Sequence, residues 1–246
     1  MTEFSARLQS LFPHLLATPA LSVLLTLIAY FAGVTIFRKL RQPVWCPPVL
    51  VAALLLAGTL SLLSISFDDY RRGAGWLSFL LGPATVALGV PLYQQFHHIR
   101  ALWRQILVTV PLAATMAAAY ALVIAWALGG SNSVMASLAP KSVTAPIAIG
   151  INQQIGGSVS LLMGSLLVTG VVASLCVDLL SRRLGIEDDR LIGLTLGING
   201  HAIGTVRAFE ISPTAGAFSS LGMGLTGVFT AVLLPFAMQL LALTAT

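Results

Sequence analysis

Long stretches without charge, separated by short charged clusters, form the dominant pattern along this chain. With histidine counted as polar, the uncharged stretches are residues 8–37, 42–67, 73–99, 105–140, 142–177, 191–206 and 211–246. A helix needs about 20 apolar residues to cross the hydrocarbon core of a membrane, which is about 30 Å thick. Most of these stretches are long enough, so the pattern predicts several membrane helices. Their expected positions are 15–37, 44–66, 76–97, 103–129, 158–181, 190–208 and 215–243, with an extra segment at 137–155.

Two of the stretches do not fit a single straight helix. As one helix, residues 142–177 would be about 54 Å long at 1.5 Å per residue. We therefore expect the chain to break or turn back at Gly156 and Gly157. Residues 191–206 are barely long enough to span and contain four glycines, each of which costs a helix about 1 kcal/mol relative to alanine. A weak, interrupted helix is predicted over 190–208.

Two segments of the chain resemble each other. Residues 83–92, PATVALGVPL, align without gaps with residues 140–149, PKSVTAPIAI, and in each a hydroxyl residue follows two positions after the first proline. Proline at the first helical position with a nearby hydroxyl is a helix-start signature. The match is either a chance likeness of two apolar stretches or a pair of half-helices whose N-termini lie near the middle of the membrane. Interrupted segments in corresponding positions are the best sequence indication of a transporter's binding site.

The topology depends on residues 137–155. If they form a re-entrant hairpin, the broken segments at 76–97 and 190–208 run in opposite directions. If they span the membrane, those two segments run parallel and the idea of an inverted repeat loses its basis.

The composition agrees with a membrane protein. Only 9% of the residues are charged and 57% are hydrophobic, the mean hydropathy is +0.93, and a soluble domain carries about 25% charged residues. We predict an all-α, polytopic membrane helix bundle with seven or eight segments, including broken or re-entrant half-helices, in which residues 1–246 form a single domain.

The net charge of +5 does not indicate a nucleic-acid-binding protein, because the basic residues sit in small groups at the ends of apolar stretches. Such groups follow from the excess of lysine and arginine in cytoplasmic loops. The two cysteines are far apart and suggest no metal site or disulfide framework. We recognise no hydrolytic triad, nucleotide-binding loop or metal cluster, so we expect a protein that is not an enzyme and has no cofactor.

Irregular backbone is tolerated at membrane depth only where it is buried in protein or lines a wet cavity. Helix N-termini there favour anions through unpaired N–H groups and the helix dipole, and nearby basic and amide side chains would strengthen that preference. The segments beginning at Pro83, Pro140 and Gly193 are therefore expected to form a mid-membrane anion site. The candidate substrate-binding residues are Thr85, Lys141, Ser142, Asn152, Asn199, His201, Thr205 and Arg207, and the candidates for proton coupling are His201 and Glu210.

Several of these residues also have structural interpretations. His201 is either a hydrogen-bonded structural residue or a ligand donor and proton switch, since histidine titrates near neutral pH. Arg207 is either an interfacial anchor or a bidentate clamp on a carboxylate. Glu210 is expected to pair with Arg207, because a three-residue spacing places both on one helical face. Asp178 is expected to pair with Arg182 and Arg183 at a helix end.

The segments PKSVTAPIAIGINQQIGG (140–157) and LGINGHAIGTVRAFEISPTAGAFSSLGMGLTGVFTAVLLP (196–235) resemble the LrgB/CidB family of bacterial membrane proteins. LGPATVALGVPLYQQ (81–95) is also similar to that family, so the resemblance covers most of residues 75–240. The family includes the plastid glycolate/glycerate translocator, in which an LrgA-like and an LrgB-like part lie on one chain.

The resemblance implies a multi-pass protein of the bacterial inner membrane with a small LrgA/CidA-like partner; a homo-oligomer is a further option. Family members have been linked to export of small carboxylates and to holin-like control of murein hydrolases. The expected function is that of a transporter subunit for a small carboxylate anion of the glycolate, glycerate, lactate or pyruvate class. The alternative is a holin- or antiholin-like protein that modulates murein hydrolase activity and autolysis.

Overall fold

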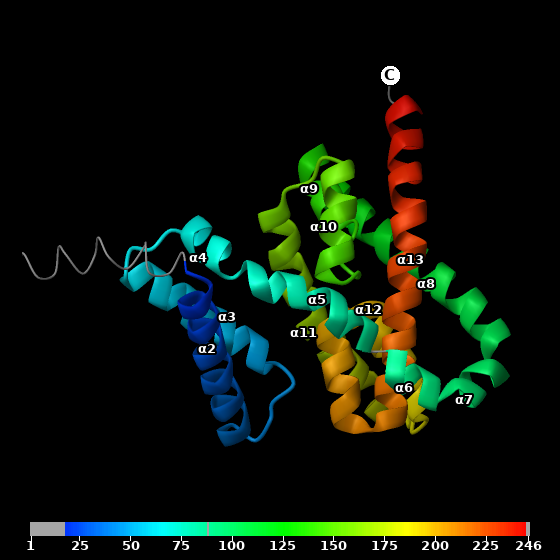
Figure 1. Cartoon of the computed structure of the whole chain (residues 1–246). Coiled ribbons are helices and arrows are strands. Elements are labelled where there is room, and N and C mark those ends of the chain that lie inside the picture. Colours follow the sequence, from blue (N-terminus) through cyan, green and yellow to red (C-terminus); the bar gives the residue numbers. More distant parts are fainter. Residues whose placement is uncertain (1–17, 88, 245–246) are drawn as a thin grey trace, which may run out of the picture. The chain divides into compact units, whose positions relative to one another are not determined.

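The computed structural model describes residues 18–87 and 89–244, with a few side chains left out, and every regular element in these ranges is a helix (Figure 1). The chain separates into two compact units, residues 1–87 and 88–246. Each unit is described by itself.

The first unit contains α2 (Pro19–Lys39), α3 (Pro48–Leu62), α4 (Phe67–Gly73) and α5 (Gly75–Ala87). Helix α2 starts with a proline in its first turn and ends with Arg38 and Lys39, whose charges complement the helix dipole. Helix α3 packs closely on α2, since a β-carbon at Gly33 would lie 2.6 Å from the Pro48 carbonyl oxygen. Pro83 lies inside α5, so the prediction that it begins a half-helix is wrong.

The second unit carries the remaining helices. They are α6 (Gly89–Gln94), α7 (Phe96–Ala101), α8 (Trp103–Ala127), α9 (Asn132–Leu138), α10 (Ala145–Gln154), α11 (Val159–Leu184), α12 (Asp189–Ile211) and α13 (Pro213–Thr244). One part of its core lies between α8, α12 and α13, where Ile106, Val110, Ile198 and Phe218 pack together.

Within the described residues, four helices are long and apolar enough to cross a membrane: α2, α8, α11 and the segment Pro213–Gln239 of α13. The helices predicted at 103–129, 158–181 and 215–243 are confirmed to within a few residues at most of their ends. The prediction of an all-α membrane bundle is likewise confirmed.

Residues 131–158 form a re-entrant hairpin, which we name the first hairpin. At 1.5 Å per residue its helices α9 and α10 are about 10 and 15 Å long, too short to cross a membrane. The two limbs pack together, because Ala139 and Ile151 share a cluster and the Ser158 amide donates to Ser137 Oγ at 2.7 Å. The chain then turns at Gly156, which has a φ of +77°, as the sequence predicted for this glycine pair.

The half-helix in this hairpin begins later than predicted. Pro140 lies in the turn between α9 and α10, and α10 begins at Ala145, with Thr144 at its N-cap and a proline in its first turn. The helix-start signature therefore belongs to Pro146, and the likeness between residues 83–92 and 140–149 does not mark two half-helices that begin at the aligned prolines.

Helix α12 is a second hairpin rather than one straight rod. Its backbone leaves the helical region at His201, with φ 42° and ψ −132°. In a straight helix Asp189 and Ser212 would be about 34 Å apart, yet Ser212 Oγ donates to Asp189 Oδ2 at 2.6 Å. Gly204 likewise lies directly against the Leu196 backbone. Residues 189–200 and 202–211 are therefore antiparallel limbs, and the predicted interruption of 190–208 is a full reversal.

The two hairpins enter from opposite ends of α11. The first precedes α11 and the second follows it, and each returns to the end from which it started. Their tips meet beside the same part of α11, because Val143 of the first hairpin packs with Leu166, and the Leu166 carbonyl accepts a 2.8 Å hydrogen bond from His201 Nε2. The chain therefore has two re-entrant segments of opposite direction, at 131–158 and 188–212.

Candidate functional site

The two hairpin tips bring two helix N-termini towards the middle of the bundle. Helix α10 starts at the first tip and residues 202–211 start at the second, and the two half-helices run away from each other toward opposite ends of α11. The first N–H groups of each lack partners within their own helix, and the helix dipoles add partial positive charge. The meeting point of the tips therefore has a field that favours an anion.

Lys141 at the first tip is a cation without a carboxylate partner. Its Nζ donates to Tyr120 Oη at 3.0 Å and lies 4.5 Å from the centroid of the tyrosine ring. No described carboxylate forms an ion pair with it. Lys141 is thus a cation of the first tip that no described carboxylate neutralises.

Three buried polar side chains near the first hairpin have no hydrogen-bond partner. Ser142 Oγ, both polar atoms of the Asn152 amide, and Thr226 Oγ1 are unsatisfied, and these residues are at most 5% exposed. Ser142 is next to Lys141, while Thr226 on α13 is next to Gly227, which lies beside Val143 and Ile147. A buried unpaired polar group costs about 1–3 kcal/mol, so these groups are suited to bind a polar solute.

The polar residues of the second hairpin are mostly used within the fold. Asn199 Nδ2 donates to the Thr195 carbonyl at 3.0 Å. His201 is 4% exposed, and its ring holds the tip against α11 through Leu166. Thr205 donates to the His201 carbonyl and contacts Ser219 Oγ at 3.0 Å, which ties the hairpin to α13. The hydrogen bonds of His201 and Thr205 therefore hold the second tip in place against α11 and α13.

Arg207 is paired with two carboxylates. Its two terminal nitrogens donate to Asp178 Oδ2 at 2.7 Å and to Glu210 Oε2 at 3.0 Å. The predicted Arg207–Glu210 pair is confirmed, whereas the prediction that Asp178 pairs with Arg182 and Arg183 is wrong, because its partner comes from α12. Arg207 also lies six residues from His201, about 9 Å along the helix toward the base of the hairpin.

A crevice of about 340 Å³ opens at this ion pair. It is lined by the end of α11, the connecting loop and the second limb of α12, and its residues include Asp178, Arg182, Glu187 and Arg207. The predicted substrate residues therefore separate into two places. Lys141, Ser142 and His201 lie at the hairpin tips, and Arg207 lies in the crevice at the hairpin base.

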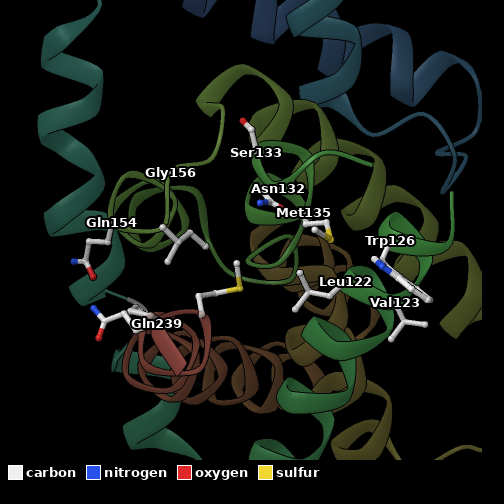
Figure 2. Close-up of a pocket in the computed structure, with 12 residues that line it drawn as sticks. Leu122, Val123, Trp126, Asn132, Ser133, Met135, Gln154, Gly156 and Gln239 are labelled. Carbon is white, nitrogen blue, oxygen red and sulfur yellow. The ribbon is translucent and has the colours of Figure 1, made fainter. Parts of the chain in front are cut away.

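A larger groove lies at the other end of the unit, between α8, the first hairpin and α13 (Figure 2). It encloses about 780 Å³, and its lining is mainly apolar with Leu122, Trp126 and Met135 among its residues. Figure 2 places the Gln154 and Gln239 amides together at one side of the groove and Trp126 at the other. Neither Lys141 nor Ser142 lines it.

Sequence reasoning missed three residues that the structure connects with the candidate site. Tyr120 contacts Lys141, Thr226 carries an unsatisfied hydroxyl, and Asp178 holds Arg207. Asp178 could have been identified as unusual, since it is the single acid between residues 69 and 187, but its partner depends on the reversal in α12. The side chain of Thr85, in α5 of the first unit, lies outside the described residues.

A model of the LrgB-like family matches residues 26–240. An uncharacterized protein of Haemophilus influenzae is 34% identical over 217 residues, which cover 88% of this chain and 94% of that protein. The uncharacterized protein YwbG of Bacillus subtilis is 30% identical over 215 residues, covering 87% of this chain and 95% of YwbG. The holin-like protein CidB of Staphylococcus epidermidis is 31% identical, with coverage of 87% and 93%. No solved structure matches the chain.

Proposed function

Because the chain belongs to the LrgB-like family of membrane proteins, we propose that it carries small carboxylate anions across the bacterial inner membrane. The substrates are hydroxy- or keto-carboxylates of the glycolate, glycerate, lactate or pyruvate class. The protein works as a transporter subunit together with a small LrgA/CidA-like membrane protein.

One observation carries this proposal: a lysine without a carboxylate partner and an unsatisfied buried serine lie side by side at a hairpin tip that faces a second, opposed tip. Lys141 supplies the charge that a carboxylate requires, and Ser142 Oγ supplies a hydrogen-bonding group. The N-terminus of α10 adds backbone N–H groups a few residues further along. A carboxylate bound there would be neutralised at membrane depth, where an uncompensated charge is costly.

The opposed hairpins also suggest how the site would be exposed alternately to the two sides. Each hairpin separates the tip region from one face of the membrane, because each enters from one end of α11 and stops near its middle. Movement of the first hairpin would open the site to one side, and movement of the second would open it to the other. This is alternating access around a central site, as in transporters with discontinuous helices.

A second candidate function is favoured by the names of the relatives. Four-fifths or more of this chain aligns with holin-like CidB proteins from two staphylococcal species, at 31% identity. A holin-like protein that modulates murein hydrolases would permeabilise the membrane to solutes of many kinds. Such a pore would not saturate and would tolerate replacement of Lys141.

Uptake of labelled glycolate and lactate into proteoliposomes tests both functions, with and without the small partner. Wild-type uptake is expected to saturate, and Lys141→Gln is expected to lower it about tenfold to a hundredfold, since a hydrogen bond to a charged group contributes about 1.5–3 kcal/mol. Lys39→Gln, at the end of α2, is the matched control and should leave uptake unchanged. Non-saturable leakage of unrelated solutes that Lys141→Gln does not alter would support the holin-like function instead.

A further inference from the structure

The cluster of Asp178, Arg207 and Glu210, which we name the base cluster, contains two carboxylates but one cation. Asp178 comes from α11, while Arg207 and Glu210 come from the second limb of α12. The side chains are 14%, 22% and 31% exposed, in that order. The cluster is therefore partly buried and carries a formal charge of −1.

The crevice connects solvent to the base cluster. It opens at the end of the second unit where the loop between α11 and α12 lies. Asp178 and Arg207 both line it. Arg182 and Glu187 line it too, and they lie in or beside the charged loop that connects α11 to α12. A proton from the aqueous phase could reach the cluster through this opening without passing the hairpin tips.

A count of charges links the base cluster to the carboxylate site. Between residues 131 and 211, leaving out the charged loop 182–190, the lysine, arginine and acidic side chains are two cations, Lys141 and Arg207, and two anions, Asp178 and Glu210. This part of the bundle is therefore neutral when empty. A bound monocarboxylate makes it negative, and a single proton restores neutrality, which the membrane interior strongly favours.

We propose that the base cluster is a proton-binding site, that Glu210 takes the proton, and that one proton moves with each monocarboxylate. The inference rests on the proposed carrier function. The step joins a proton to a Glu210 carboxylate oxygen and converts it to a neutral carboxylic acid, so the Arg207–Glu210 ion pair is lost. The Arg207–Asp178 pair remains, and the cluster becomes neutral.

Glu210 is the better proton acceptor of the two carboxylates for geometric reasons. It is the more exposed, and its contact with Arg207 is longer, at 3.0 Å against 2.7 Å for Asp178. Its partner is also on its own helix, so releasing that pair does not separate α12 from α11. The Asp178 pair joins the two elements and is the one that a carrier would keep.

Outside the charged loop and the base cluster, His201 is the other titratable group on the second hairpin, and its surroundings disfavour protonation of its ring. Its Nε2 already donates to the Leu166 carbonyl, so a further proton would create a buried imidazolium. His201 is only 4% exposed, so little water is available to solvate that charge. Glu210 contacts Arg207, whose other terminal nitrogen binds Asp178. Arg182 and Glu187 line the crevice with Asp178 and Arg207, and Glu210 is not among its lining residues.

The test compares two modes of transport in proteoliposomes made with the full chain and, where uptake requires it, the small partner. The first mode is net uptake of labelled glycolate driven by an inward proton gradient, and the second is exchange of labelled for unlabelled glycolate at equal pH. Wild type should show both, and its uptake should not respond to an imposed membrane potential. In Glu210→Gln, which resembles the protonated form, net uptake is expected to fall about tenfold. Exchange should remain within about twofold of wild type, since it needs no proton step.

Asp68→Asn is the matched control, because it removes an exposed acid on α4, outside the base cluster and the crevice, and it should leave both modes unchanged. The proposal is overturned if Glu210→Gln retains full gradient-driven uptake, or if His201→Gln abolishes the response to the gradient while Glu210→Gln does not. Wild-type exchange without any response to a proton gradient would also overturn it and would leave the carrier function standing. Absence of saturable exchange in wild type would instead contradict the carrier function itself.

Discussion

Lys141 and Arg207 are the two basic side chains of the described hairpins outside the charged loop, and their neighbours give them different roles. The two terminal nitrogens of Arg207 are ion-paired with Asp178 and Glu210, although its Nε is buried without a partner, whereas Lys141 contacts a tyrosine and no described carboxylate. A cation that already pairs with two anions has little charge left for a substrate. The sequence alone favoured Arg207 as the clamp because the planar guanidinium suits a carboxylate, and it could not show that an aspartate 29 residues away occupies it.

Arg207→Gln is therefore expected to lower stability rather than act on substrate binding alone. Removing the guanidinium leaves two partly buried carboxylates facing each other, at a cost of about 1–3 kcal/mol once partial exposure is considered. The double variant Arg207→Gln/Asp178→Asn should recover much of that loss, because it removes one of the two charges. Thermal unfolding in detergent measures both. A stable Arg207→Gln protein that has lost saturable uptake would return Arg207 to the substrate site.

Asp188 lies at the N-cap of α12, outside the membrane segments. It should make the stability of the folded chain weakly dependent on pH in the acid range. Its carboxylate accepts hydrogen bonds from the Arg190 side chain, which lower its pKa from 3.8 to about 2. A depressed pKa stabilises the folded state above about pH 4, and the contribution disappears as the pH falls toward 2. The pair is exposed, so the effect should not exceed about 1 kcal/mol. Melting temperatures of wild type and Asp188→Asn at pH 7 and pH 3 should converge at the lower pH, and a constant difference would contradict this assignment.

The second hairpin depends on glycines that let its limbs approach α13. Gly193 lies against the Ala215 backbone and Gly197 against the Ser219 backbone, so a methyl group has no room at either position. Gly197→Ala should destabilise the protein by about 1–3 kcal/mol through overpacking. Gly164→Ala in α11 is the matched control: a β-carbon there meets nothing within 4 Å, and the change should be neutral or slightly stabilising. Equal melting temperatures for the two variants would show that the close packing at Gly197 is not required.

The glycines also show how much of the fold can be predicted from the sequence. The four glycines of residues 191–206 predicted a weak helix over 190–208, and the pair at 156–157 predicted the turn before α11. Both predictions follow from backbone propensity. That α12 reverses at His201 could not be predicted, because the reversal depends on contacts between distant residues, such as Asp189 with Ser212 and His201 with Leu166. Residues 83–92 resemble 140–149 in sequence, whereas the segment that opposes the first hairpin is 188–212, which has no obvious sequence likeness to it.

The arrangement of the second unit makes a specific prediction about membrane sidedness. Helix α8 ends where the first hairpin begins, and α11 runs from the first hairpin to the second, so Ser131 and Glu187 should lie on opposite sides of the membrane. Arg100 lies just before α8 and Arg104 lies in its first turn. Both then lie on the same side of the membrane as Arg182 and Arg183, as the positive-inside rule requires. We therefore predict that this side is cytoplasmic and that the first hairpin enters from the opposite side.

Single cysteines test this arrangement in a background in which Cys46 and Cys176 are replaced by serine. Ser131→Cys and Glu187→Cys occupy exposed positions at the two ends of the unit. In intact cells a membrane-impermeant maleimide should label the cysteine at 131 and leave the one at 187 unlabelled, while permeabilised cells should show both. Labelling of both positions in intact cells would place the two hairpins on the same side. Two gates that face opposite compartments would then be excluded, and with them alternating access at the hairpin tips.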